Sequence, residues 1–397
     1  MIDAQLRQAR GALGLSFFVQ GAVFALLVTR IPAIQDRYGI SDGALPIFLA
    51  AVPILAGVGS VAAEHLVKRV RPSVVLRWVQ PVVCLTLAGV GLGDQVWQAA
   101  VALAAFGLAV GALDASMNML GVSLQRAYGR SIMLGFHAAY SLGGITGASL
   151  AWVGAHWDIS LALLYGCVVV VLAPAAFYGS RYYRDAQSER AEEAAPEGGS
   201  RAYRALLPLC MVMAFAYIGD ATVSNWSAKY LDDVLHSSEE LATVPYNVYM
   251  VTTLLGRALG DRGVARWGGA AVVRAGTVLA GVGFAVVAVA PGAWTGMAGF
   301  TLLGFGLCVI VPQTFAAAGR LFPGSDTAIA RLNIFNYVGF LVGAPLVGGI
   351  GEAWSYRGAM LIPMAMVLAT LFYARSYGTA PARYGGGHDR ARAADVG

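Results

Sequence analysis

Long runs of apolar residues, separated by short polar segments, extend along the whole chain. A helix needs about 20 apolar residues to cross the hydrocarbon core of a bilayer. By that rule the 397-residue sequence contains twelve spans. They cover residues 11–30, 44–63, 74–93, 97–123, 132–154, 159–179, 205–227, 242–260, 270–290, 294–318, 328–350 and 357–376. We therefore expect an all-α membrane protein of twelve transmembrane helices.

Charged residues are scarce and lie almost entirely between these runs. Apolar residues make up 58% of the chain and charged residues 12%, whereas soluble domains carry about 25% charged residues. A water-soluble globule of this composition would lack the polar surface to cover itself. The net charge of +5 comes from residues in short loops, so it does not indicate nucleic-acid binding.

Residue types that catalysis or metal binding requires are not grouped in this sequence. The four cysteines, Cys84, Cys167, Cys210 and Cys308, all fall inside apolar runs, and none belongs to a C-x-x-C or Cys/His cluster. We find neither a nucleotide-binding loop nor a serine nucleophile elbow. We therefore expect no enzyme activity, no metal and no cofactor.

The distribution of charges between the spans predicts the orientation. If both termini lie inside, the outer loops hold only four of the 27 basic residues, namely Arg30, Arg37, Lys229 and Arg357. The same loops carry acids instead, including Asp36, Asp94, Asp158, Asp232 and Asp233. The positive-inside rule then predicts a multi-pass protein of the bacterial cytoplasmic (inner) membrane with both termini in the cytoplasm.

The longest polar stretch, 180–204, separates six spans from six. We expect an N-terminal six-helix bundle (1–179), a cytoplasmic linker (180–204), a C-terminal six-helix bundle (205–376) and a cytoplasmic tail (377–397). An internal repeat supports this division at a constant offset of 197 residues: Gly59, Glu64, Arg69 and Arg77 correspond to Gly256, Asp261, Arg266 and Arg274. This pattern predicts two pseudo-symmetric bundles in parallel orientation.

The better preserved copy of this repeat runs from Gly256 to Gly268 and resembles the signature loop of the major facilitator superfamily. An acid at a helix end that faces an arginine across the bundle would form a lock, which must break before that side opens. The alternative, simple positive-inside topology, accounts for the arginines but not for the acids. The candidate gate residues are Gly59, Glu64, Arg69, Gly256, Asp261, Arg262 and Arg266.

Two acids, Asp114 and Asp220, lie deep inside predicted helices. A carboxylate at bilayer depth costs about 2.5–3.5 kcal/mol on insertion scales, so it normally faces a cavity or a partner. Asn118 shares a helix face with Asp114, and we expect no lysine or arginine at similar depth. Both acids therefore suit proton binding or solute binding, and the sequence leaves open which does which. The alternative is a structural acid that is hydrogen-bonded within the bundle.

Several other polar residues also fall inside the spans. His137 begins the fifth span and either responds to pH near neutrality or is an ordinary helix-end histidine. Trp226 either stacks on a solute ring or anchors at the interface. The remaining candidates are Gln20, Tyr140, Asn225, Asn247, Gln313, Asn333 and Asn336. Interhelical hydrogen bonding explains each one singly, but together they favour a cavity for a neutral or cationic polyol, sugar or amine.

Seven segments carry a resemblance to the rhizopine-associated membrane proteins, a branch of the major facilitator superfamily that is distantly similar to fucose permeases. The segments are Arg30-Ile-Pro-Ala-Ile, Ser41-Asp-Gly-Ala-Leu, Asp114-Ala-Ser-Met-Asn118, Gln125-Arg-Ala-Tyr-Gly-Arg130, Gly135-Phe-His137-Ala-Ala-Tyr-Ser-Leu-Gly-Gly144, Asn225-Trp-Ser-Ala-Lys-Tyr-Leu231 and Gly256-Arg-Ala-Leu-Gly-Asp261. The resemblance implies a major facilitator fold and an alternating-access carrier with a central cavity. It also implies proton coupling and an amino-cyclitol or sugar-like cargo.

The sequence departs from that branch at one place. An acid often precedes the tryptophan of the seventh helix in these proteins, whereas here Asn225 precedes Trp226 and the nearby acid is Asp220. The departure leaves the coupling residue open. The fifth span lacks the Gly-Pro pair of drug/proton antiporters, and the fourth lacks an arginine, which disfavours multidrug efflux.

The leading interpretation is a secondary active transporter of a small polar solute (sugar, polyol, amino-cyclitol or amine) that works by alternating access and is coupled to protons. One alternative is an exporter of a metabolite or antibiotic, and another is a membrane sensor that has lost transport. The deep acids favour a carrier, because a sensor needs no proton carrier. The expected partners are the solute, protons and the lipid bilayer, with no nucleic acid, and we expect a monomer.

Overall fold

The computed structural model describes residues 3–41, 45–185, 200–238, 241 and 244–377. Throughout these residues the chain is helical, with no strand in the described part. Most of the expected linker (186–199) and most of the expected tail (378–397) lie outside the described residues. Of the residues expected in the linker, Ser180–Tyr182 form the short helix η1 and Ser200 begins α8.

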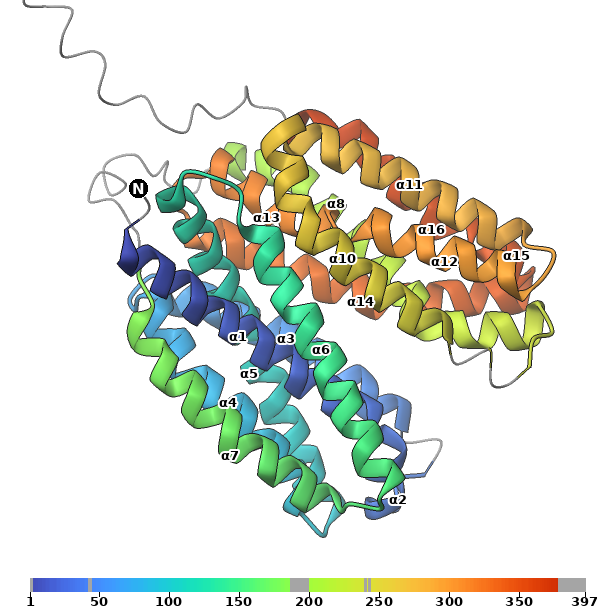
Figure 1. The fold of residues 1–397 in the computed structure, drawn as a ribbon, viewed down its shortest axis with the longest axis horizontal. Coiled ribbons are helices and arrows are strands. Elements are labelled where there is room, and N and C mark those ends of the chain that lie inside the picture. The colour runs from blue at the N-terminus through green and yellow to red at the C-terminus, as the bar shows by residue number, and fades with distance from the viewer. Residues whose placement is uncertain (1–2, 42–44, 186–199, 239–240, 242–243, 378–397) are drawn as a thin grey trace, which may run out of the picture.

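Six long helices form the first bundle and pack mainly with one another (Figure 1). They are α1 (Ala4–Thr29), α3 (Leu45–Leu66), α4 (Pro72–Leu92), α5 (Val96–Tyr128), α6 (Met133–His156) and α7 (Leu161–Gly179), with the short α2 (Ile31–Tyr38) after α1. Close packing of α1 on α6 depends on glycine, because a Cβ on Gly143 would overlap the carbonyl oxygen of Phe18. Small residues of this kind let membrane helices approach at the backbone.

The second bundle also has six spans, of which two are interrupted. Its elements are α8 (Ser200–Lys229) with η2 (Tyr230–Val234), α10 (Val244–Trp267), α11 (Gly269–Val289), α12 (Ala293–Leu307) with α13 (Ile310–Leu321), α14 (Asp326–Ala353), and α15 (Tyr356–Ala359) with α16 (Leu361–Ala369) and η3 (Thr370–Tyr377). The span expected at 294–318 breaks between α12 and α13. Pro312 then falls in the first turn of α13, where no N–H is required.

Nine helical segments of the described chain are long and apolar enough to cross a membrane. The other three spans are α3, α6 and α10, with 22, 24 and 24 residues, which is also sufficient length. Polar and charged residues lower the apolar character of α6 and α10, and the start of α3 lies next to undescribed residues. The prediction of twelve transmembrane helices in two bundles is confirmed.

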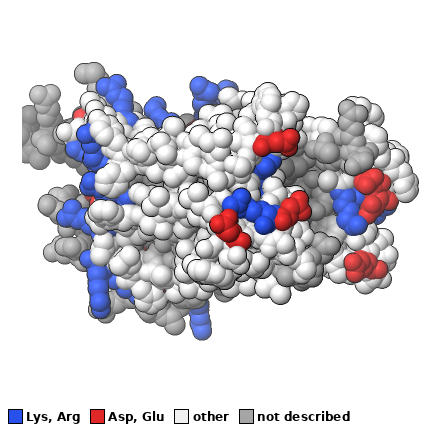
Figure 2. Space-filling view, turned by 90° about the horizontal axis from the view of Figure 1, so that it is seen from below, with Lys and Arg blue, Asp and Glu red and all other residues white. Residues whose placement is uncertain are grey.

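The two ends of the molecule differ in charge. At one end, called the basic end, lie the start of α1, the α3–α4 and α5–α6 connections and residue Tyr377. Lys and Arg gather there, at the left of Figure 2, whereas Asp and Glu gather toward the opposite, acidic end. The ribbons of the two bundles converge toward the basic end and diverge toward the acidic end, where α2 and α15 lie (Figure 1).

Candidate functional site

The seam between the bundles is formed by a few helices. The helices α3 and α5 contact α14, and α6 contacts α10 and α13. Polar residues that the sequence placed in different spans meet along this seam. The contacts below describe it from the middle of the molecule to the basic end.

Asp114 on α5 is the centre of a polar network that crosses the seam. Its Oδ2 accepts hydrogen bonds from Asn336 Nδ2 at 3.0 Å and from the Tyr337 hydroxyl at 3.2 Å, both on α14. Its Oδ1 accepts from Asn118 Nδ2 at 3.3 Å, and the side chain of Gln20 on α1 also bonds to this carboxyl group. The carboxylate thus holds α1, α5 and α14 together.

The same network continues toward the basic end and returns to α5. Asn336 Nδ2 also donates to Asn333 Oδ1 at 3.0 Å, and Asn333 Nδ2 donates to Ser60 Oγ on α3 at 3.0 Å. The Ser60 hydroxyl in turn donates to the carbonyl oxygen of Gly111 at 3.0 Å. The sequence singled out both asparagines by their spacing, but nothing in it distinguished Ser60 from other small helix residues.

Asp220 on α8 has a different set of contacts, all within the second bundle. Its Oδ1 accepts a hydrogen bond of 2.5 Å from the hydroxyl of Tyr249 on α10. Farther toward the acidic end, Tyr246 bonds to Ser224 and remains partly exposed, and Asn225 is exposed. Polar groups that solvent can reach therefore lie between Asp220 and the acidic end.

Both acids are deep in the molecule and still reached by solvent. Protein atoms surround Asp114 and Asp220 on all sides, yet each carboxyl-bearing residue is only half-buried. Residues on a lipid-facing surface would be exposed without being surrounded, and residues in dry packing would be fully buried. Each acid therefore lies between the helices with part of its surface open to solvent, and we call this region the recess.

Tyrosines from both bundles complete this recess. Tyr140 and Tyr217 lie within electrostatic reach of both Asp114 and Asp220, and Tyr337 lies within reach of Asp114. We call these five residues (Asp114, Asp220, Tyr140, Tyr217 and Tyr337) the central site. Tyr217 was not among the sequence candidates, although it precedes Asp220 by three positions and so shares its helix face.

The structure corrects the expectation that no lysine or arginine lies near these acids. Arg257 on α10 is half-buried and lies within electrostatic reach of Asp220. Its Nη1 donates to Ser141 Oγ at 2.7 Å and to the carbonyl oxygen of His137 at 3.5 Å, both on α6. Arg257 lies in the motif that begins at Gly256 and was not a sequence candidate. The sequence pattern does not show which way its side chain points.

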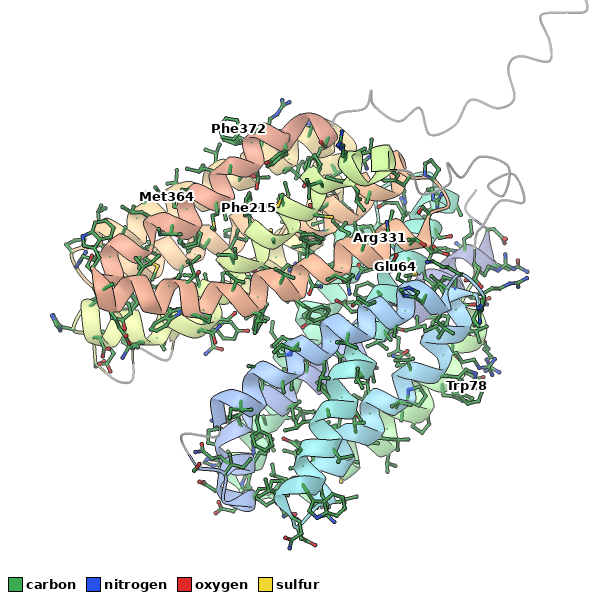
Figure 3. All side chains as sticks on the ribbon, turned by 180° about the vertical axis from the view of Figure 1, so that it is seen from behind. Glu64, Trp78, Phe215, Arg331, Met364 and Phe372 are labelled. Atoms are coloured by element: carbon green, nitrogen blue, oxygen red, sulfur yellow. The ribbon has the colours of Figure 1, made fainter. Side chains whose placement is uncertain are left out.

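Glu64 and Arg331 form an ion pair between the bundles nearer the basic end. Glu64 Oε1 on α3 accepts from Arg331 Nε on α14 at 2.7 Å, and Figure 3 shows the two side chains facing each other where the bundles meet. The glutamate is buried and the arginine is about one-third exposed. The sequence selected Glu64 but not Arg331, since 267 positions separate them in the chain.

Asp261 makes a second contact between the bundles, in which its hydrogen bonds go to a helix end and Arg10 on α1 lies within electrostatic reach. Its Oδ1 accepts from Ser131 Oγ at 2.6 Å, and its Oδ2 accepts from the backbone N–H of Gly135 at 2.9 Å. Both donors lie at the N-terminus of α6, where unpaired N–H groups and the helix dipole favour an anion. Asp261 thereby ties α10 to α6.

The other gate candidates have packing or surface positions. Arg69, Arg262 and Arg266 are exposed, and within the described residues no ion pair to a carboxylate is seen for them. Gly59 and Gly256 allow close helix contact, because a Cβ there would overlap the Leu108 carbonyl oxygen and the Cys308 sulfur, respectively. Among the described residues, the arginine that forms an ion pair with an acid across the seam is Arg331.

The remaining candidates do not converge on the central site. His137 is buried between the rings of Phe17 and Phe315, at 5.4 and 6.3 Å. Trp226 donates its ring N–H to the Ala344 carbonyl oxygen at 3.0 Å and packs on Tyr356, so its ring is engaged inside the second bundle. Gln313 is fully buried in α13, without a side-chain partner in the described chain, and Asn247 is exposed on α10.

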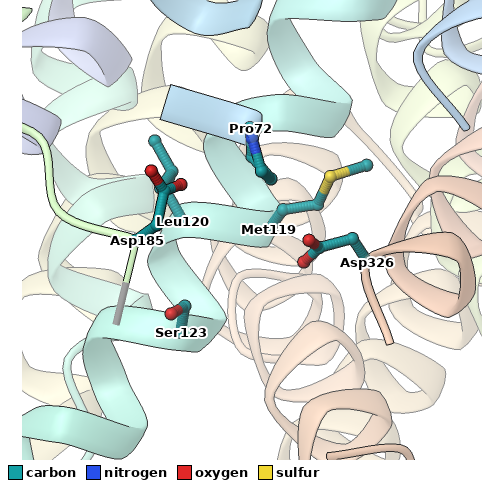
Figure 4. A pocket seen from close by; sticks show the side chains of 6 residues that line it. All are labelled: Pro72, Met119, Leu120, Ser123, Asp185 and Asp326. Atoms are coloured by element: carbon teal, nitrogen blue, oxygen red, sulfur yellow. The ribbon is translucent and has the colours of Figure 1, made fainter. Parts of the chain in front are cut away.

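A small cavity lies between the bundles at the basic end (Figure 4). It measures about 10 Å³, which is about the space that one water molecule needs. Its lining comprises Pro72, Met119, Leu120, Ser123, Asp185 and Asp326. This cavity is too small for an organic solute.

Comparison with known proteins agrees with this architecture. Residues 209–393 match the family model of the Major Facilitator Superfamily. The chain is 28% identical over 378 residues to an uncharacterized MFS-type transporter of Yersinia pestis, which covers 91% of this chain and 94% of that protein. It is 27% identical over 375 residues to the membrane protein MosC of Rhizobium meliloti, with 92% and 90% covered.

The fold is also similar to a solved transporter structure. FucP in the outward conformation superposes with a TM-score of 0.77 at 15% identity, covering 93% of this chain and 98% of that one. Together with the two six-helix bundles, these matches support a transporter of the major facilitator superfamily, as the resemblance in the motifs predicted.

Proposed function

We propose that this protein moves a small polar solute across the bacterial cytoplasmic membrane by alternating access, coupled to protons. The observation that carries the proposal is the central site, in which two partly exposed acids from different bundles lie within electrostatic reach of the same two tyrosines, Tyr140 and Tyr217. Carboxyl groups inside membrane segments typically mark proton relays or substrate pathways. A binding site at the interface of two repeats is the arrangement that rocking of one bundle against the other requires.

The conformation described here faces outward under this proposal. The positive-inside rule assigns the basic end to the cytoplasm, and the ion pair of Glu64 with Arg331 and the contact of Asp261 with α6 close that end. Both contacts must break before cargo can leave to the cytoplasm. FucP, which is a fucose:proton symporter, shows a similar fold in its outward conformation.

The chemistry of the central site favours a neutral or cationic cargo. Tyrosine hydroxyls donate and accept hydrogen bonds, and carboxylates accept only, so the site suits hydroxyl and amino groups. An anion would meet two carboxyl groups there. The guanidinium of Arg257 is a single positive charge against these two carboxyl groups, and its Nε and Nη1 already donate to Cys308, His137 and Ser141. A polyol, sugar, amino-cyclitol or amine is therefore the proposed cargo.

We assign the coupling proton to Asp114 and cargo binding to Asp220. Asp114 accepts hydrogen bonds from Asn336 and Tyr337 across the seam, so a proton on this carboxyl group removes acceptor capacity and weakens the contact between the bundles. Protonation and separation of α5 from α14 then occur together. Asp220 makes no such contact in the described residues, because Tyr249 lies in its own bundle, so it can bind cargo without a change in the seam.

Transport by the purified protein in liposomes tests this proposal. Polyols, sugars, amino-cyclitols and amines are supplied outside vesicles with an alkaline interior and, separately, vesicles with an acidic interior. We expect accumulation of one class in the first case, whereas accumulation only in the second would indicate proton antiport and export. Asp114→Asn should retain exchange of solute but lose accumulation, and Asp220→Asn should lose both. Normal accumulation by both variants would contradict the assignment.

A further inference from the structure

A cluster of arginines and aromatic rings lies on the outer surface of the first bundle, away from the seam. It comprises Arg77 and Trp78 on α4, Phe177 and Tyr178 on α7, and Arg181 and Tyr182 on η1, and we call it the α4–α7 patch. Figure 3 shows Trp78 at the outer edge of this bundle, on the side away from the second bundle. We propose that the α4–α7 patch binds the headgroup of an anionic phospholipid.

The patch consists of two sets of contacts, which meet in sequence at Phe177 and Tyr178. The ring of Phe177 lies 5.7 Å from that of Trp78 and 5.1 Å from the Arg77 guanidinium carbon. One turn farther along, the Arg181 guanidinium carbon lies 3.1 Å from the ring centre of Tyr178 and 5.1 Å from that of Tyr182. Cations over aromatic faces at these distances are attracted to the ring. The rings thus hold each guanidinium group at the basic end of this bundle.

The guanidinium groups remain available for a ligand. Within the described residues neither Arg77 nor Arg181 forms an ion pair with a carboxylate, and both side chains are exposed. Arginine presents planar N–H donors that match a phosphate in pairs, and stacking on an aromatic ring leaves those edges free. Each of these guanidinium groups therefore fits a singly charged phosphodiester.

The position of the patch identifies the source of that phosphate as a lipid. Trp78 and Tyr178 are 60% and 62% exposed, as expected for rings that sit at the level of the lipid headgroups. The patch belongs to the basic end, where α4 begins and α7 ends. Anionic lipids at a membrane surface attract basic residues at that depth. A soluble phosphate compound would leave these exposed rings without a partner.

The second bundle supplies an internal comparison. At the repeat offset of 197 residues, Arg77 corresponds to the exposed Arg274, but Trp78 corresponds to Ala275 and Phe177 to Ala374. The duplicated position keeps the positive charge without the aromatic rings. If a positive charge alone were sufficient for lipid binding, Arg77 and Arg274 would bind anionic lipid equally well.

Native mass spectrometry of the detergent-purified protein tests the proposal, with phosphatidylglycerol and phosphatidylcholine of identical acyl chains as probes. We expect retention of phosphatidylglycerol in preference to phosphatidylcholine. The double variant Arg77→Ala/Arg181→Ala should lose about thirtyfold in phosphatidylglycerol affinity, since each basic residue contributes about 1 kcal/mol and 1.4 kcal/mol is tenfold. The matched control Arg274→Ala should bind like the unchanged protein.

Three outcomes would overturn the proposal. They are equal binding of the two lipids, unchanged binding in the double variant, and an equal loss in Arg274→Ala. The double variant Arg77→Lys/Arg181→Lys keeps both positive charges. It serves as the control for loss of lipid binding that is caused by misfolding. We expect it to retain phosphatidylglycerol preference but to bind several-fold more weakly, because lysine lacks the planar paired donors. Complete loss in this folded, charge-conserving variant would also contradict the proposal.

Discussion

Glu64 and Asp261 occupy the same position in the two copies of the repeat, but the structure gives them different partners. Glu64 pairs with a side chain, Arg331, at 2.7 Å, whereas Asp261 bonds to a hydroxyl and a backbone N–H at the N-terminus of α6. One contact depends on a flexible arginine, whereas the other depends in part on a backbone N–H that has no rotamers. Duplication thus kept an acid at both places, while the opposite bundle determined what the acid binds.

The largest effect is expected at Asp261. The variant Asp261→Ala removes two hydrogen bonds to a carboxylate, each worth about 1.5–3 kcal/mol, from the closed basic end. We expect a shift of roughly 3 kcal/mol toward the conformer that is open at this end, which is more than a hundredfold in population. The distance between spin labels at the exposed positions Lys68 and Arg274 measures this shift. An unchanged distance distribution would show that Asp261 does not close the seam.

Removing the arginine of the ion pair should have the next largest effect. Arg331→Gln leaves Glu64 buried without its cationic partner, and an unpaired buried charge is costly. Because Arg331 is about one-third exposed, solvent screening reduces the expected shift to roughly 2 kcal/mol. Glu64→Gln should shift the equilibrium less, since the arginine that it leaves can reach water. The same label pair reports both variants, and a larger effect of Glu64→Gln would reverse this reasoning.

A single neutral partner of Asp261 should contribute less than the carboxylate itself. Ser131→Ala removes one hydroxyl donor but leaves the bond from the Gly135 N–H. We expect a shift of about 1 kcal/mol, or roughly fivefold in population. Ser131→Thr preserves the hydroxyl and serves as the control. A shift as large as that of Asp261→Ala would mean that the helix end contributes nothing.

The smallest effect is expected for the exposed arginines of the two repeats. Arg69→Ala and Arg266→Ala change surface charges that make no ion pair in the described residues. Such substitutions typically alter free energies by less than about 0.5 kcal/mol, so the label distances should not change. A shift comparable to that of Arg331→Gln would show that these arginines belong to the lock after all.

The recognition of the spans and of the two deep acids required only the sequence. An apolar run of sufficient length indicates a membrane helix by itself, because each helix in lipid must form all of its backbone hydrogen bonds within its own segment. Asp114 and Asp220 stood out for the same reason, since charge at that depth is costly. The repeat and the loop charges likewise depend on order along the chain.

The partners of those residues were decided by the tertiary structure. Asp114 meets Asn336 across 222 positions and Glu64 meets Arg331 across 267, and no local pattern encodes such pairings. The inward direction of Arg257 and the engagement of Trp226 within its own bundle also depend on helix rotation, which hydropathy does not specify. The sequence determined which groups enter the membrane, because insertion is a local free-energy balance. How those groups meet was determined by the packing of two bundles, which is a non-local property.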